Sequence, residues 1–411
     1  MSERRVALLS LHTSPLAQPG TGDGGGMNVY VDALATSLAR AGLACDVITR
    51  AEHPDVPETV EVEAGYRVVH VPVGSYERLT KHELLEHTDD FTAAVLDHVD
   101  RHGVDYCVLH ANYWISGAVG HQLKHALDRP LVATFHTLAR VKADAGVDDD
   151  PLERTKVEHD VIACSDLVLA STTDERTQLV SHYAAAEDRI EIVPPGVDHE
   201  VFSSGGRSGR AHSRVALGLG RGPVLLFVGR IQPLKRADLA VDTLAELDDA
   251  TATLVIVGGP SGPDGVAELA RIHERVDSLG LARQVRFVAP QPHDRLRDFY
   301  RAADVCLVPS HTESFGLVAL EAAACGTPVV AADVGGLRAL VDHGETGFLV
   351  DARRGSDYAA LVAGLLAYPQ AAAAMGRRAE TRSRGFAWSI TAARLRRLYA
   401  DLVEREPVSC M

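Results

Sequence analysis

The sequence lacks the features of a membrane-embedded, secreted or nucleic-acid-binding protein. None of its hydrophobic runs approaches the roughly 18–20 residues needed to span a bilayer, and the apolar stretch near its start is too short for the core of a signal peptide. Its 411 residues include 41 Lys and Arg against 56 Asp and Glu, so a broad surface for nucleic acid or anionic lipid is not expected. We therefore expect a globular cytoplasmic protein.

Cysteine is scarce and scattered. The sequence contains no Cys-x-x-Cys pair and no zinc-ligand spacing among Cys45, Cys107, Cys164, Cys306, Cys325 and Cys410. In a chain of this size, such a distribution predicts buried thiols in a reducing compartment.

Short apolar runs alternate with amphipathic stretches in both halves of the chain. The expected strands cover residues 6–11, 45–49, 67–73, 106–111, 131–136, 166–172, 190–198, 223–229, 252–259, 285–289, 305–310, 328–332 and 347–350. Near-continuous apolar strands separated by helices predict two doubly wound, Rossmann-like α/β domains that face a central cleft. We place their boundary before a Gly/Ser/Arg-rich stretch at residues 203–214, which gives domains at 1–198 and 199–385. A C-terminal helix at 386–411 would cross back to the first domain.

A glycine-rich segment at residues 18–31 leads into a helix that begins near Asn28. It contains a literal Gly-x-Gly-x-x-Gly at Gly20, Gly22 and Gly25. A dinucleotide site is disfavoured because prolines separate these glycines from the strand, and because the expected acidic residue after the second strand is missing. Glycines before a helix instead predict a ligand loop whose backbone amides approach an anion; the alternative is a flexible surface loop.

Two constellations in the second half point to phosphate and sugar chemistry. Arg230 and Lys235 flank the start of a helix, where two cations and the helix dipole would stabilise a diphosphate; solvated surface cations are the alternative. Glu313 and Glu321 are eight residues apart, about 12 Å along a helix, which is too far for a hydrolytic carboxylate pair. They suit the two ends of an extended ligand, unless Glu321 faces solvent and Glu313 caps the helix.

Together these stretches resemble the retaining glycosyltransferases of the GT-B fold over nearly the whole chain. Residues 12–31 are similar to the D-inositol-3-phosphate glycosyltransferase family of mycothiol biosynthesis, which transfers N-acetylglucosamine from UDP-GlcNAc to 1D-myo-inositol 3-phosphate. Sucrose and sucrose-phosphate synthases share a looser version of this loop. The resemblance implies a retaining UDP-sugar hexosyltransferase that needs no cofactor for its chemistry, and it leaves a homodimer open.

The resemblance also implies roles for individual residues. Those expected to bind the acceptor are His12, Asp23, Gly24, Gly25, Gly26, Met27, Asn28, Lys81, Tyr113, Thr137 and Arg154. Those expected to bind the donor are Gln18, Pro19, Gly26, Arg230, Lys235, Gln291, Glu313, Ser314, Phe315, Gly316, Leu317 and Glu321. Catalytic roles fall to His136, Arg230, Lys235 and Glu313, with a core histidine as the alternative for His136. A structural Mg²⁺ is implied at Tyr300, Arg301, Ala303 and Thr327.

The acceptor stays open at this point. The family usually reads Glu-Pro-x-x-Arg followed by Gly-Glu, whereas this chain has Asp-Pro-Leu-Glu-Arg at 150–154 and then Val157-Glu158. Glu153 and the acidic run at 148–150 would place negative charge beside an acceptor phosphate, and Arg154 could form a surface ion pair with Glu158. An aminocyclitol such as 2-deoxystreptamine, or a sugar, is therefore the alternative acceptor. An NAD(P)-dependent oxidoreductase and a non-catalytic nucleotide-sugar-binding protein are the other classes.

Overall fold

The computed structural model describes residues 4–22, 24–144, 146 and 152–410. The chain divides into two compact units. The N-terminal unit consists of residues 1–17, 27–194 and 388–411, and the C-terminal unit consists of residues 18–26 and 195–387. The glycine-rich loop from the first half of the sequence therefore belongs to the C-terminal unit, and the last helix belongs to the N-terminal unit.

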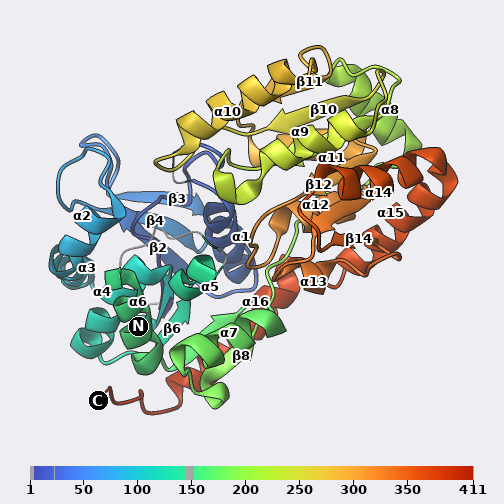
Figure 1. Ribbon diagram of the computed structural model, residues 1–411. Coiled ribbons are helices and arrows are strands. Elements are labelled where there is room, and N and C mark those ends of the chain that lie inside the picture. Colours follow the sequence, from blue (N-terminus) through green and yellow to red (C-terminus); the bar gives the residue numbers. More distant parts are fainter. Residues whose placement is uncertain (1–3, 23, 145, 147–151, 411) are drawn as a thin grey trace. The chain divides into compact units, whose positions relative to one another are not determined.

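The N-terminal unit is built on an eight-stranded sheet of order β3-β4-β2-β1-β5-β6-β7-β8 (Figure 1). Its strands are β1 Arg5–Leu9, β2 Cys45–Arg50, β3 Thr59–Glu63, β4 Tyr66–Val71, β5 Tyr106–Asn112, β6 Leu131–Thr134, β7 Leu167–Ala170 and β8 Ile190–Ile192. All neighbouring strands are parallel except β3, which pairs antiparallel with β4. A search for near-continuous apolar runs misses β3, because this edge strand is largely exposed and alternates polar with apolar residues.

Helices cover both faces of this sheet. They are α1 Gly26–Arg40, α2 Lys81–Glu86, α3 Thr88–His102, α4 Trp114–Leu127, α5 Ala139–Asp144, α6 Leu152–Cys164, α7 Thr173–Tyr183 and α16 Trp388–Val403. Residues of α1 and α16 pack on one face, while residues of α3, α4, α6 and α7 pack on the other. The Tyr399 hydroxyl of α16 lies 2.7 Å from His110 Nδ1, so the last helix is held to the centre of the sheet by a buried hydrogen bond.

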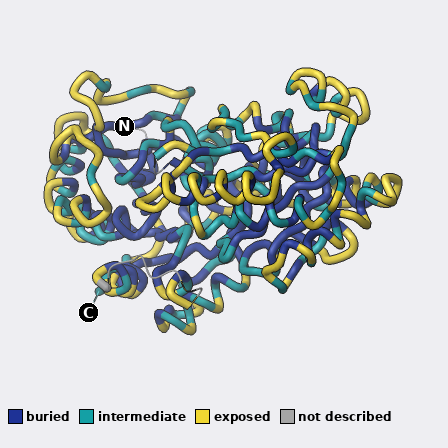
Figure 2. The backbone as a smooth tube through the Cα atoms, turned by 45° about the horizontal axis from the view of Figure 1, so that its top comes forward, coloured by how far each residue is buried: buried dark blue, intermediate teal, exposed yellow. Residues whose placement is uncertain are grey.

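The C-terminal unit has a six-stranded, all-parallel sheet of order β11-β10-β9-β12-β13-β14. Its strands are β9 Val224–Val228, β10 Thr253–Val257, β11 Val285–Val288, β12 Val305–Val308, β13 Val329–Ala332 and β14 Gly347–Val350. Its helices are α8 Gly206–Ala216, α9 Ala237–Glu246, α10 Gly265–Ser278, α11 Leu296–Ala302, α12 Leu317–Ala324, α13 Leu337–Leu340, α14 Gly355–Ala367 and α15 Pro369–Ser383. The central strands β9, β10, β12 and β13 are mostly buried, whereas β11 at one edge is only partly buried. Figure 2 shows buried segments in the interior and exposed segments at the periphery.

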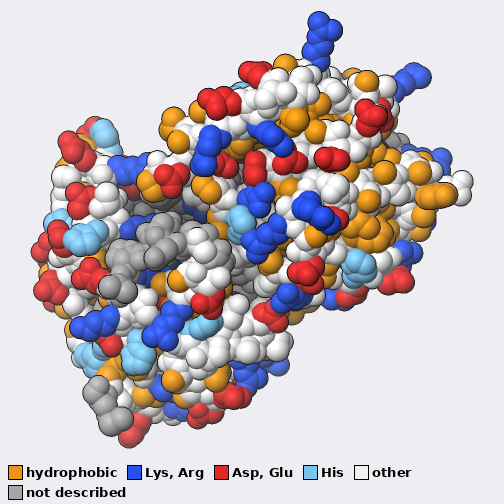
Figure 3. All heavy atoms as spheres, viewed as in Figure 1, with side chains coloured by type: hydrophobic (Ala, Val, Ile, Leu, Met, Phe, Trp, Pro, Cys, Tyr) orange, Lys and Arg blue, Asp and Glu red, His pale blue; other side chains and the backbone are white. Residues whose placement is uncertain are grey.

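Both strand orders agree with the predicted doubly wound Rossmann-like architecture. The Gly/Ser/Arg-rich stretch forms helix α8, which the pattern does not reveal. Arg210 and Arg214 of this helix pair with Asp304, and Arg214 Nε also donates to the Ala302 carbonyl. In the described part of the chain no single helix has the length and apolarity of a membrane span, and only the bent pair α14–α15 reaches them jointly. Basic and acidic side chains are mixed on the face shown in Figure 3.

The expectation that all six cysteines are thiols is wrong at two positions. Cys164, at the end of α6, forms a disulfide with Cys410, while Cys45, Cys107, Cys306 and Cys325 are free. The two partners are 246 residues apart, so no spacing rule could pair them. They meet because the segment after α16 returns along the N-terminal unit.

Glu175 provides a prediction about pH dependence. Burial raises the pKa of this carboxyl from 4.5 to about 7, although Oε2 accepts a 2.7 Å hydrogen bond from the Ser171 amide. Between these values the unfolded chain has released the proton that the folded chain still holds, so stability falls as pH rises from about 4.5 to 7. Above pH 7 the buried charge costs about 3 kcal/mol of the free energy of unfolding, and the neutral variant Glu175→Gln should not show this loss.

Urea unfolding of wild type and Glu175→Gln at pH 5 and pH 8 measures this effect. The variant is expected to gain stability relative to wild type at the higher pH and much less at the lower pH. A difference that does not change with pH would contradict the assignment.

Candidate active site

The glycine-rich loop is held by the carboxyl ends of strands in the C-terminal unit. Gln18 Nε2 donates to the Gln291 carbonyl at 2.6 Å, and the Ser261 hydroxyl donates to the Gly22 carbonyl at 2.6 Å. Within the loop, the Gly20 amide donates to the Gly24 carbonyl at 2.9 Å. The loop is thus fixed at both ends and in its middle, which excludes the alternative of an unattached flexible loop.

The glycines of this loop allow close contact with the proposed diphosphate site. A Cβ atom at Gly25 would lie 3.0 Å from Arg230 Nε, closer than nine in ten real contacts of this kind. At Gly26 it would lie 3.7 Å from Leu317 Cδ1, at the first residue of α12. The loop therefore lies against both Arg230 and the beginning of α12.

Lys235 and Glu313 are joined directly. Lys235 follows β9 at the end of a short 3₁₀ turn, Pro233–Lys235, and its Nζ lies 2.6 Å from Glu313 Oε2. Both side chains remain partly exposed, and the Ser310 hydroxyl donates to the same carboxylate oxygen at 3.3 Å. The ammonium group is therefore held in place, so the alternative of a solvated surface cation does not describe it.

Helix α12 begins with its amide groups presented beside these charges. Its N-cap is Gly316, with φ 103°, and no side chain caps it, so Glu313 does not have the capping role considered above. A Cβ atom at Gly336 would lie 2.3 Å from Phe315 Cα, and the Gly336 amide donates to the Glu313 carbonyl at 2.8 Å. The glycine pair at 335–336 thus fixes the backbone that carries Glu313, Ser314 and Phe315. Phe315 itself is buried in the core.

Glu321 is buried, which excludes the alternative that its side chain simply faces solvent. Its side chain is 6% exposed, and its two oxygens lie 2.7 Å from His293 Nε2 and 2.7 Å from the Tyr300 hydroxyl. His293 was not singled out in the sequence, because it lies in a short 3₁₀ turn without a recognisable motif. Glu321 is thus held by His293 and Tyr300, and its proposed contact with the donor stays a prediction.

The residues implied for magnesium meet at the end of α11. The Thr327 hydroxyl donates to the Tyr300 carbonyl at 2.6 Å, and the Ala303 amide donates to the same carbonyl at 3.2 Å. Oxygen donors of this kind suit Mg²⁺. Here the Thr327 hydroxyl and the Tyr300 carbonyl are joined by a hydrogen bond, and the metal site stays a prediction.

In the N-terminal unit, the predicted acceptor residues gather around Tyr113. Tyr113 follows β5 directly and has φ 76°, a left-handed conformation that is uncommon for a residue with a side chain. Lys81 Nζ lies 5.5 Å and Arg154 Cζ 5.0 Å from its ring centroid, and the His12 ring lies 4.6 Å away. Two cations and a histidine therefore converge on one aromatic ring at the carboxyl edge of the sheet.

Arg154 is fully buried in a network of specific bonds, so it is not a surface ion pair. Its Nε donates to Glu158 Oε1 at 2.7 Å, its Nη1 to the Tyr113 hydroxyl at 3.3 Å, and its Nη2 to the Thr137 hydroxyl at 3.0 Å. Glu158 also accepts hydrogen bonds from the Ala139 amide and the Tyr183 hydroxyl. This guanidinium fixes two of the hydroxyl groups expected at the acceptor site.

His136 follows β6 and is also left-handed, with φ 62°. Its Nε2 lies 3.0 Å from Asn112 Oδ1, and its ring packs edge-on against Tyr30 at 4.8 Å. Burial lowers the pKa of His136 to about 3, so the imidazole is neutral at physiological pH. Because Asn112 Oδ1 is an acceptor, Nε2 carries the proton of the neutral ring, and Nδ1 is an acceptor without positive charge.

The remaining acceptor residues lie at the start of α1 and near α6. Asn28 is buried, and its Nδ2 donates to the Thr13 hydroxyl at 2.8 Å and to the Ser14 carbonyl at 2.5 Å. Met27 packs against the N-terminal core. Glu153 is exposed, and its Oε2 lies 3.7 Å from His82 Nε2. Asp23 and the acidic run at 148–150 lie outside the described residues.

Comparisons with known proteins agree across both units. The family model "Glycosyl transferases group 1" matches residues 210–382, and "Glycosyl transferase 4-like domain" matches residues 25–196. A D-inositol 3-phosphate glycosyltransferase from Kineococcus radiotolerans is 46% identical, with 98% of this chain and 96% of that protein covered. The protein of the same name from Corynebacterium glutamicum is 42% identical, with 98% of each chain covered.

Solved structures share the fold. Sucrose-phosphate synthase from Thermosynechococcus elongatus has a TM-score of 0.90 at 32% identity, over 97% of this chain and 99% of that chain. Anabaena HepE in complex with UDP-glucose has a TM-score of 0.77 at 20% identity, over 97% of this chain and 99% of that chain.

Proposed function

Because the chain belongs to the group 1 glycosyltransferases of the GT-B fold, in a family with the D-inositol 3-phosphate glycosyltransferases, we propose that it is a retaining N-acetylglucosaminyltransferase. The donor is UDP-GlcNAc, the acceptor is 1D-myo-inositol 3-phosphate, and the configuration of the anomeric carbon is retained. The observation that carries the acceptor assignment is the pair of cations, Lys81 and Arg154, within 5.5 Å of the centre of the Tyr113 ring. A phosphate dianion requires such converging donors. An aminocyclitol without phosphate would meet repulsion there.

The donor is assigned to the C-terminal unit. Its diphosphate would lie between Arg230, Lys235 and the first amides of α12, with the glycine-rich loop against it. Glu313, held by Lys235, would accept a hydrogen bond from a hydroxyl of the donor sugar, and Glu321 would accept hydrogen bonds from the ribose of the nucleotide. Fixed positive charge at the bond being broken stabilises the negative charge that develops on the leaving UDP.

The reaction breaks the bond between the anomeric carbon and the β-phosphate oxygen and forms a bond from that carbon to an inositol hydroxyl oxygen. We assign attack to the face from which UDP leaves, and the hydroxyl proton passes to the departing phosphate oxygen. His136, whose imidazole is neutral because burial lowers its pKa, would accept a hydrogen bond from a sugar hydroxyl. The chemistry needs no cofactor, and a Mg²⁺ at Tyr300, Arg301, Ala303 and Thr327 would stabilise the fold only.

Lys81→Ala tests the acceptor assignment without disturbing the core, because Lys81 is exposed at the start of α2. Loss of a charge-assisted hydrogen bond should lower kcat/KM for inositol 3-phosphate by about 10- to 150-fold. The KM for UDP-GlcNAc and the low activity with unphosphorylated inositol should not change. Steady-state kinetics with both acceptors measures the effect.

The matched control is Lys156→Ala, which removes an exposed lysine of α6 that has no proposed role. It should behave as wild type. An equal loss by Lys81→Ala with both acceptors would contradict a phosphate contact.

A further inference from the structure

A second cluster of chemically reactive side chains lies in the N-terminal unit, in none of the positions assigned to donor or acceptor. His121 and His125 are four residues apart on α4, Cys164 ends α6, and Cys410 lies in the segment after α16. One ligand atom from each of the four lies within 4.8 Å of all the others. No zinc-ligand spacing is recognisable along the chain, because these residues come from three segments that only the fold brings together.

Two nitrogen–sulfur distances in the cluster match edges of a zinc tetrahedron. His125 Nε2 lies 3.6 Å from Cys164 Sγ and 3.2 Å from Cys410 Sγ. Bond lengths of about 2.3 Å to sulfur and about 2.0–2.1 Å to nitrogen place a sulfur and a nitrogen ligand of Zn²⁺ roughly 3.5 Å apart. The imidazole is therefore at ligand separation from each sulfur atom. The two sulfur atoms, which are bonded to each other in the disulfide, must move to roughly 3.7 Å apart after reduction to share one Zn²⁺.

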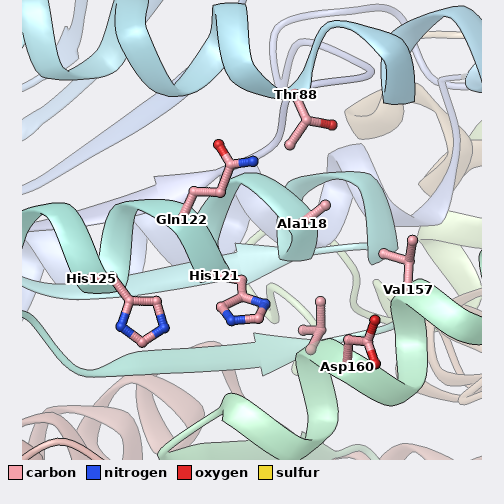
Figure 4. A pocket seen from close by; sticks show the side chains of 8 residues that line it. Thr88, Ala118, His121, Gln122, His125, Val157 and Asp160 are labelled. Atoms are coloured by element: carbon pink, nitrogen blue, oxygen red, sulfur yellow. The ribbon is translucent and has the colours of Figure 1, made fainter. Parts of the chain in front are cut away.

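The histidines share one side of their helix. Residues at i and i+4 lie one above the other on an α-helix, and the rings of His121 and His125 have centroids 5.3 Å apart. Figure 4 shows both rings projecting from the same side of α4. Both line a cavity of about 320 Å³, together with Gln122 and Asp160.

A buried ion pair holds the three segments together. Lys124, which lies between the two histidines on α4, donates from Nζ to Asp166 Oδ2 at 2.8 Å and to the Cys164 carbonyl at 2.8 Å. Asp166 Oδ1 accepts a hydrogen bond of 2.5 Å from the Val408 amide, two residues before Cys410. Lys124 and Asp166 are almost fully buried, so the tail is positioned by interactions that do not depend on its sulfur atom.

We propose that, in the dithiol state, Cys164, Cys410, His121 and His125 bind one Zn²⁺ ion in a closed structural site. Two thiolates and two neutral imidazoles are a ligand set that zinc prefers, and four protein ligands leave no open position for catalysis. Binding replaces the two thiol protons, which are released to solvent. The disulfide is the metal-free oxidised form, and a phosphine reductant converts it to two thiols as the phosphine and one water become phosphine oxide.

The zinc site would fasten the C-terminal segment to α4 and α6. This segment follows α16, whose buried residues Trp388, Leu395 and Tyr399 complete one face of the N-terminal sheet. Metal binding therefore stabilises the packing of the last helix and takes no part in sugar transfer.

Zinc content of the full chain tests the proposal. The protein is reduced with tris(2-carboxyethyl)phosphine, equilibrated with Zn²⁺, passed through a desalting column and analysed for metal; cobalt is then substituted to record its absorption. We expect one zinc per chain, and a cobalt spectrum with tetrahedral ligand-field bands and thiolate charge transfer. Loss of a residue that only supports a ligand lowers metal affinity by about 10- to 100-fold. Cys410→Ser and His125→Ala each remove a ligand itself, and each should weaken zinc binding by more than this.

Two matched controls are Cys107→Ser and His159→Ala, a half-buried thiol and an exposed histidine outside the cluster. Both should retain one zinc per chain. UDP-sugar transfer by Cys410→Ser should persist, which shows that this variant folds and separates the metal site from the proposed activity. Absence of zinc from the reduced wild type, or full zinc content in Cys410→Ser, would overturn the proposal.

Discussion

Replacing Lys235 with methionine is expected to lower kcat for sugar transfer by about 100- to 1,000-fold, the range found when one preorganised donor to a developing oxyanion is removed. The ammonium group is positioned by Glu313 at 2.6 Å and cannot be replaced by solvent with the same precision. UDP binding, measured by calorimetry, should weaken as well. Initial rates of UDP release give the change in kcat.

The variant also frees the Glu313 carboxylate, whose charge could itself repel the donor. The double variant Lys235→Met/Glu313→Gln removes that charge and is compared with Glu313→Gln alone, because Glu313 is itself proposed to bind a sugar hydroxyl. The double variant should be slower than this single variant if the lysine acts on the diphosphate. Arg221→Ala, an exposed cation of the same unit, is the matched control and should retain full activity. Wild-type transfer by Lys235→Met would refute the diphosphate assignment.

Arg154→Ala is expected to lower the free energy of unfolding by about 3–5 kcal/mol, because it leaves the buried Glu158 carboxylate without its cation. It should also raise the KM for inositol 3-phosphate far more than the KM for UDP-GlcNAc. Tyr113 and Thr137 lose the guanidinium that fixes their hydroxyl groups. Chemical denaturation and steady-state kinetics measure the two effects.

A second substitution separates stability from acceptor binding. In Arg154→Met/Glu158→Gln the buried charge is removed together with its partner, so much of the stability should return. The acceptor KM should stay high, because neither charge nor hydroxyl orientation is restored. Recovery of both properties would show that Arg154 acts on the fold alone.

The alternating apolar pattern predicts both sheets, since nearly continuous Val, Leu and Ile runs are required in strands covered on two faces. It does not predict β3, an exposed edge strand that pairs with the neighbouring β4, or α8, whose Arg210 and Arg214 pair with Asp304. Continuous apolar runs mark strands buried on both faces, and neither of these two elements contains such a run.

The candidate site shows the same division. Motif spacing points to Arg230, Lys235 and Glu313, but not to the direct ion pair between the last two. The sequence suggests a surface ion pair for Arg154 as one alternative, whereas the structure buries it with Glu158. His293 beside Glu321 carries no motif at all. Such contacts arise where different strands end at the same edge of a sheet, and a single segment does not contain that information.

A crystal structure of the protein with UDP bound tests the central claim most directly. The account predicts that the β-phosphate lies within hydrogen-bond distance of Arg230, Lys235 and the first backbone amides of α12. A diphosphate bound at another site of the chain, or bound without contact to either cation, would contradict it.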